Sequence, residues 1–110
     1  MTGKPLLIVR AFVEPEIRPE FERWYREVHL PHILKIPGIV SAYRCSSLRS
    51  GINWVAVYEF RDESAVQEGF GSQEAAQARK DWEHWSGNVR DLSVEVYAQL
   101  SPLPAYHYWN

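Results

Sequence analysis

The chain has 110 residues, of which 45% are hydrophobic and 24% are charged, and its formal net charge at pH 7 is −2. These values are typical of a globular protein and exclude a disordered chain. The lysines and arginines form no basic stripe, so we expect no nucleic acid partner. No apolar run reaches the roughly 18 residues that a transmembrane helix needs, so we expect no membrane partner.

The aromatic content is high, with five Trp, six Tyr and four Phe. Side chains of this kind indicate an extensive core, a partner interface or a pocket for a flat apolar ligand. The single cysteine, Cys45, cannot form an internal disulfide, and residues 1–5 lead into an apolar stretch that is too short for a signal peptide. We therefore expect a cytoplasmic protein in which Cys45 is a small buried hydrophobic residue.

The first half of the chain predicts a strand followed by a helix. Residues 6–13, LLIVRAFV, are apolar on both faces with one charged interruption, as in a strand that is buried on both sides. Residues 16–30 predict an amphipathic helix, whose apolar stripe is Phe21, Trp24, Tyr25 and Val28. Pro31 disturbs this helix, and Pro37 and Gly38 end a further apolar turn.

The second half predicts a hairpin, a helical region and a last strand. The hairpin strands cover residues 39–47 and 53–60. Two helical pieces follow and end near residues 70 and 85, and the last strand covers residues 92–100. The order β-α-β-β-α-β is the ferredoxin-like arrangement of an α+β protein, and we expect residues 1–110 to form one such domain.

This arrangement leaves one face of the sheet without helices. The strands over residues 6–13 and 53–60 carry large apolar groups on both faces, and an exposed patch of that size would favour aggregation. A second copy of the sheet is the simplest cover, so the sequence predicts a homodimer. The aromatic tail is predicted to lie on the partner through Tyr106, Tyr108 and Trp109.

The predicted first helix carries a motif that resembles a known family. The segment FERWYREVHLPHILKIPGIVSAYRC, residues 21–45, is similar to the EthD-like branch of the dimeric α/β barrel superfamily. The matching W-Y-x-x-x-H-L-P core and P-G turn consist of Trp24, Tyr25, His29, Leu30, Pro31, Pro37 and Gly38. The resemblance implies two ferredoxin-like subunits that join their sheets into a barrel, with a pocket between sheet and helices in each. Relatives include cofactor-free monooxygenases, lactone isomerases, polyketide cyclases, dehydratases and haem-handling enzymes, so the resemblance implies no single activity.

His29 is the first candidate catalytic residue. It lies near the bend at Pro31, where its side chain could face the pocket and exchange protons near neutral pH. Alternatively, it bonds a free carbonyl at the helix end, where a positive charge is also favoured. His32 could share the site, but a third ligand at suitable spacing is missing nearby, so we predict no metal.

Tyr58 is the second candidate catalytic residue. A phenol in an apolar pocket can polarise or orient a substrate oxygen, whereas the alternative is a core tyrosine that bonds at the rim. His84 is expected to face the solvent. The side chains predicted to bind substrate or form the pocket wall are Tyr25, His32, Trp54, Trp82 and Trp85.

These residues favour a small-molecule enzyme without a cofactor. The predicted chemistry is proton transfer (isomerisation, cyclisation, dehydration or oxygenation) on an aromatic or polyketide-like compound, with His29 as the base and Tyr58 holding an oxygen. The alternative is a non-catalytic protein that binds a hydrophobic ligand, or an accessory protein of a degradation pathway. A third class, an RNA-binding module, is disfavoured by the acidic balance and by the absence of an RNA-recognition motif.

Overall fold

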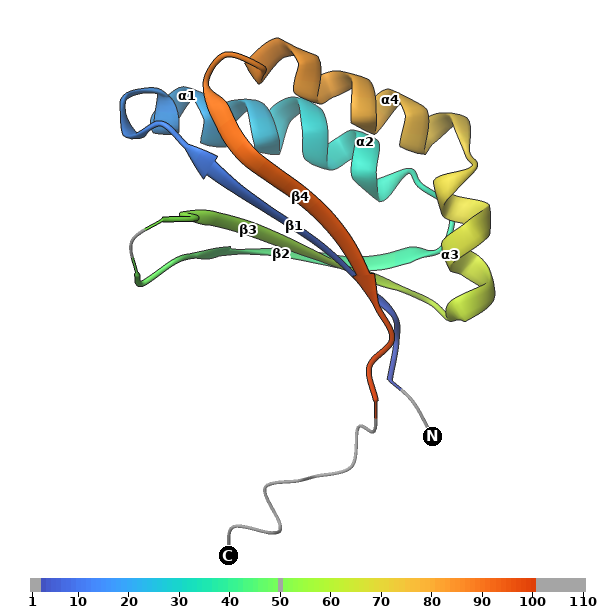
Figure 1. Cartoon of the computed structure of the whole chain (residues 1–110). Helices are drawn as coiled ribbons and strands as arrows, with labels where there is room; N and C mark the ends of the chain where they lie inside the picture. Colours follow the sequence, from blue (N-terminus) through green and yellow to red (C-terminus); the bar gives the residue numbers. More distant parts are fainter. Residues whose placement is uncertain (1–2, 50, 101–110) are drawn as a thin grey trace, which may run out of the picture.

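The computed structural model describes residues 3–49 and 51–100 (Figure 1). Its four strands form one antiparallel sheet in the order β2-β3-β1-β4, and its helices lie on one face of that sheet. This confirms the predicted ferredoxin-like α+β arrangement. Along the chain the elements are β1 (Leu6–Val13), η1 (Pro15–Ile17), α1 (Arg18–Trp24), η2 (Tyr25–His29), α2 (Leu30–Leu34), β2 (Ile39–Ser46), β3 (Trp54–Phe60), α3 (Glu63–Phe70), α4 (Gln73–Asp81), η3 (Trp82–Trp85) and β4 (Val89–Tyr97).

The predicted tail contacts through Tyr106, Tyr108 and Trp109 fall outside the described residues. Within residues 3–49 and 51–100, no helix combines the length and the apolar character that crossing a membrane requires.

The two central strands, β1 and β3, bury alternate side chains beneath the helices. Successive residues of a strand point to opposite faces of the sheet, so every second residue of each strand enters the core. The side chains on the helix-covered face are all buried: Leu7, Val9, Ala11, Val13, Trp54, Ala56, Tyr58 and Phe60. Together with Phe21 and Tyr25 of the first helix they form the hydrophobic core.

The opposite face of the sheet carries no helix in the described part of the chain (Figure 1). Its central side chains are apolar, as predicted: Leu6, Ile8, Phe12, Val55 and Val57. Two arginines also lie on this face, where Arg10 pairs with Glu95 and the Arg90 guanidinium lies 4.6 Å from the Phe12 ring centroid. We call this surface the open face.

Cys45 lies exposed on β2, where it pairs with Val55 and so belongs to the open face. The expectation that Cys45 is buried is therefore wrong for the single chain. The reason is that β2 is an edge strand whose outer side no helix covers.

A π-helical turn, η2, interrupts the first helix at Tyr25–His29. The Leu30 N–H donates to the Tyr25 carbonyl, one residue further back than in an α-helix. Pro31 explains the wider turn, since in a regular helix its ring would clash with the carbonyl of Glu27.

The wider turn changes which side chains face the sheet. Phe21, Tyr25, His29 and Ile33, spaced four residues apart, are all at most 5% exposed. Val28, by contrast, is 40% exposed, so its assignment to the apolar stripe is wrong. The π-helical turn has rotated Val28 outward and has placed His29 on the buried face.

Side-chain caps fix the two helices of the second half. The Asp62 carboxylate accepts the Ala65 N–H at 2.9 Å, and the Ser72 hydroxyl oxygen accepts the Ala75 N–H at 3.1 Å. Each bond satisfies one of the N–H groups that the first turn of a helix leaves without a partner. These caps set where α3 and α4 begin.

The last strand begins three residues earlier than predicted, at Val89. The pairing of β1 with β4 shifts between Arg10 and Phe12, and Asp91 has a φ of 56° in this bulge. A bulge inserts an extra residue and breaks the alternation of side chains. The alternation of apolar and polar residues is therefore regular only after the bulge, which explains why the predicted strand starts at residue 92.

Candidate functional site

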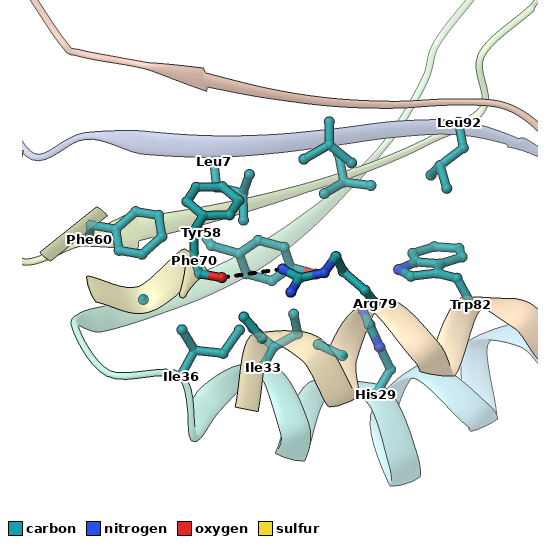
Figure 2. A pocket seen from close by; sticks show the side chains of 15 residues that line it. Leu7, His29, Ile33, Ile36, Tyr58, Phe60, Phe70, Arg79, Trp82 and Leu92 are labelled. Atoms are coloured by element: carbon teal, nitrogen blue, oxygen red, sulfur yellow. Dashed lines mark hydrogen bonds between the residues drawn. The ribbon is translucent and has the colours of Figure 1, made fainter. Parts of the chain in front are cut away.

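A cavity of about 370 Å³ lies between the sheet and the helices (Figure 2). It exists because the helices present very small residues there, namely Gly69 of α3 and Ala75 and Ala78 of α4. Its volume lies within the range of small-molecule sites. Most of its remaining wall is apolar and consists of Leu7, Val9, Ile33, Ile36, Phe60, Phe70, Leu92 and Val94.

The cavity opens beside β4. Leu92 and Val94 line it and yet are 44% and 54% exposed, because β4 is an edge strand of the sheet. Four of the lining residues have polar side-chain atoms, namely His29, Tyr58, Arg79 and Trp82. A ligand would therefore meet an apolar wall with a small number of fixed polar groups.

His29 is 1% exposed and is held from several sides. The Trp24 ring stacks on it with centroids 5.1 Å apart, and the Trp82 ring meets it edge-on at 5.2 Å. Its Nδ1 lies 3.1 Å from the Asp81 Oδ2 atom at the end of α4. These contacts fix the position and the orientation of the imidazole.

Asp81 receives two further hydrogen-bond partners. His32 Nδ1 lies 2.7 Å from the same Oδ2 atom, and Gln77 Nε2 donates to Oδ1 at 3.1 Å. Burial alone would raise the pKa of Asp81, but the hydrogen bonds from His32, His29 and Gln77 lower it overall. Asp81 is therefore a carboxylate near neutral pH.

The Asp81 carboxylate determines which nitrogen of His29 carries the proton. A carboxylate accepts hydrogen bonds and cannot donate them, so the Nδ1 atom of His29 must be the donor. In the neutral ring the Nε2 atom is then unprotonated, and it forms no hydrogen bond with any described residue. His29 thus has a free lone pair at a residue that lines the cavity.

The pKa of His29 lies below its usual value of 6.5. Burial lowers this pKa, and the hydrogen bond and negative charge of Asp81 oppose the effect only in part. The imidazole is consequently neutral at pH 7 and can accept a proton.

Tyr58 contacts a second tyrosine through its hydroxyl group. The Tyr25 and Tyr58 oxygens are 2.9 Å apart, and burial raises the pKa of both phenols, so both remain protonated near neutral pH. Tyr25 has no other hydrogen-bond acceptor among the described residues, whereas Tyr58 lines the cavity. Either hydroxyl can donate in this pair, and when Tyr25 donates, the Tyr58 O–H is available to a ligand.

The chain can now be compared with known proteins. Residues 5–93 match the family described as "Domain of unknown function (DUF4286)". The chain belongs to this family. No curated protein matches it.

Several solved structures share the fold of this DUF4286 member. An EthD family protein of Bacillus halodurans is 18% identical with a TM-score of 0.70, covering 91% of this chain and 100% of the other. Rv0793 of Mycobacterium tuberculosis is 20% identical with a TM-score of 0.65, covering 92% and 99%. SnoaB of Streptomyces nogalater, a cofactor-independent oxygenase, is 13% identical with a TM-score of 0.65, covering 93% and 99%. These likenesses confirm the EthD-like, dimeric α/β barrel type of fold.

The residues predicted for the site occupy different layers around the cavity. His29, Tyr58 and Trp82 line it, Tyr25 lies behind Tyr58, and His32 lies on the outer side of Asp81.

Trp54 and Trp85 lie in the core and do not line the cavity. Both contact the ring of Phe21, with centroid distances of 5.2 and 5.5 Å. Their placement gives them a packing role beneath the site.

Two residues of the site, Arg79 and Asp81, were missed from sequence. Asp81 is 52 positions from His29, and nothing in the local pattern connects them. Arg79 left a weak signal, because it stands with Ala75, Ala78 and Trp82 at the spacing of one helix face. A charged residue within an otherwise apolar stripe could have been identified as a candidate site residue.

Proposed function

We propose that this protein is a small-molecule enzyme that moves a proton within its cavity, with His29 as the base. The observation that carries the proposal is the bond between His29 Nδ1 and Asp81, which leaves Nε2 unprotonated at the cavity. An aspartate in this position holds the ring in one tautomer and stabilises the imidazolium that forms. Trp24 and Trp82 prevent the ring from turning away.

The proposed step is removal of a proton from carbon. The C–H bond next to a substrate carbonyl breaks, the proton goes to His29 Nε2, and the electron pair moves to the carbonyl oxygen. The Tyr58 O–H donates a hydrogen bond to that oxygen and stabilises the enolate. No metal or nucleotide is required for this step, because the side chains supply both the base and the hydrogen-bond donor.

The cavity wall supports an apolar or aromatic substrate, as in a polyketide-like compound. Its polar groups are few and its area is mostly aliphatic and aromatic, which favours a flat hydrophobic body. An enolate can then isomerise, cyclise, lose water or react with oxygen. The likeness of fold to SnoaB, a cofactor-independent oxygenase, is compatible with the last of these.

We also propose that two copies pair through the open face. Apolar side chains occupy its centre, and Arg10 and Glu95 neutralise each other within the chain. An apolar sheet face of this kind is stabilised when a second sheet removes it from water. The cavities lie on the other side of each sheet and would remain accessible.

Proton exchange from solvent tests the proposed chemistry without knowledge of the natural substrate. Enolisable aromatic ketones would be incubated with the protein in D₂O, and deuterium incorporation would be followed by mass spectrometry. His29→Ala should reduce the exchange rate by about 10²–10⁴-fold. His84→Ala, which removes an exposed histidine of η3, is the matched control and should exchange as the wild type does.

Two results would contradict the proton-transfer proposal. One is undiminished exchange by the His29→Ala variant. The other is exchange no faster than in buffer for ketones that demonstrably bind the cavity. The second result would favour a non-catalytic protein that binds a hydrophobic ligand, a function that the predominantly apolar wall also suits.

A further inference from the structure

Arg79, an exposed residue, contributes a positive charge to the lining of the apolar cavity. Its position on α4 places it between Ala75 and Trp82 on the face that lines the cavity. Figure 2 shows the guanidinium extended toward Phe70, whose carbonyl accepts a hydrogen bond from Nη1 at 3.4 Å. This contact is long, so it engages the guanidinium only weakly.

The charge of Arg79 has no counterion in the described part of the chain. None of the ion pairs among these residues includes Arg79. Glu83, one helical turn further along, forms no such pair either. A guanidinium has five N–H donors, and the Phe70 carbonyl uses one of them.

The other polar groups of the wall are neutral near pH 7. Burial lowers the pKa of His29, and burial raises the pKa of Tyr58, so neither carries a charge. Asp81 does not line the cavity, and its carboxylate already accepts hydrogen bonds from His29, His32 and Gln77. Among the described lining residues, Arg79 is thus the one that carries a charge.

We propose that the cavity binds a molecule with an apolar body and a carboxylate, and that Arg79 binds the carboxylate. The planar guanidinium can donate two parallel hydrogen bonds to a carboxylate, a geometry that neutral groups cannot reproduce. Because Arg79 is exposed, added salt should weaken this ion pair. This inference rests on the proposed function, and it narrows the substrate to an apolar carbonyl compound that is also an acid.

A matched pair of probes tests the inference, namely 2-naphthoate and its neutral analogue 2-naphthamide. Binding of each would be measured by isothermal titration calorimetry at low salt. The wild type should bind the acid at least about 10-fold more tightly than the amide, since charged hydrogen bonds are the stronger ones. Arg79→Gln should abolish that preference, and Arg79→Lys should retain part of it.

Lys80→Gln is the control, because it removes the same charge from the neighbouring exposed position. It should leave the preference for the acid intact. A wild type that binds both probes equally, or binds neither, would overturn the inference, as would a preference that survives in Arg79→Gln.

The inference and the proposed function can fail separately. Loss of the acid preference with His29-dependent exchange intact on neutral ketones would refute only the role of Arg79. An Arg79-dependent preference without any His29-dependent exchange would keep the carboxylate site and refute the base.

Discussion

The two faces of the sheet use alternate residues of the same strands for different purposes. On the helix-covered face, β3 contributes Trp54, Tyr58 and Phe60, which are at most 1% exposed. Tyr58 and Phe60 line the cavity, whereas Trp54 packs in the core. On the open face the intervening residues of β3 are Val55, Val57 and Glu59, which meet no helix.

The difference lies in how polar groups are satisfied. On the helix-covered face, the hydroxyls of Tyr25 and Tyr58 bond each other. His29 there bonds Asp81. On the open face, the Arg10–Glu95 pair is exposed and lies among apolar neighbours. One face therefore holds the fixed polar groups on which the proposed chemistry depends, and the other holds the apolar side chains on which the proposed pairing of two copies depends.

The largest effect is expected from Asp81→Asn, on the helix-covered face. The new amide N–H₂ can donate to His29 Nδ1 and favour the tautomer whose Nε2 carries the proton, which cannot act as a base. The rate of ketone exchange should fall by up to about 10⁴-fold. Asp81 also raises the pKa of His29, so its loss should lower that pKa further.

Glu83→Gln is the control for Asp81→Asn, because it removes an exposed acid two positions away. Exchange kinetics and folding would be compared across the two variants. Unchanged exchange in Asp81→Asn would show that the hydrogen bond to His29 has no catalytic role.

Neighbouring residues of β3 provide the next comparison. Trp54→Ala should lower the free energy of unfolding by about 3–5 kcal/mol, because it leaves a large cavity among buried rings. Val55→Ala, on the open face, should cost no more than about 1–2 kcal/mol. Urea unfolding at one fixed protein concentration measures both, and equal losses would contradict the distinction between the faces.

A charge on the open face tests the pairing of two copies. Val57→Lys would place an unpaired ammonium group at the centre of the proposed interface, which should weaken association by about 100-fold or more. Leu48→Lys is the control, since Leu48 is 99% exposed outside the strands. Analytical ultracentrifugation would measure both, and a wild type that is monomeric at high micromolar concentration would refute the pairing.

The smallest effect is expected from Ser72→Ala, which removes the cap of α4. The loss of this N-cap should cost about 1 kcal/mol. Because α4 loses its cap, the backbone amides of this helix should exchange with solvent faster. The association of two copies should stay unchanged, since α4 lies on the other face of the sheet. A change in oligomeric state would show that the two faces are coupled.

Local patterns were sufficient to predict the fold, since the change in hydrophobic period from strand to helix is visible at each boundary. They failed where backbone irregularity broke the period, at the π-helical turn that exposes Val28 and at the bulge before Leu92. His29 was found because it stands in a local motif. Asp81 could not be found, because its contact with His29 depends on how two distant helices pack.

The protonation state of His29 is the most direct test of the account. Nitrogen NMR of the imidazole in the wild-type protein would identify which ring atom carries the proton. At pH 7 we predict a neutral ring with the proton on Nδ1 and a bare Nε2, and a titration with its midpoint below pH 6.5. A ring that is charged at pH 7, or that carries its proton on Nε2, would contradict the role of His29 as the base.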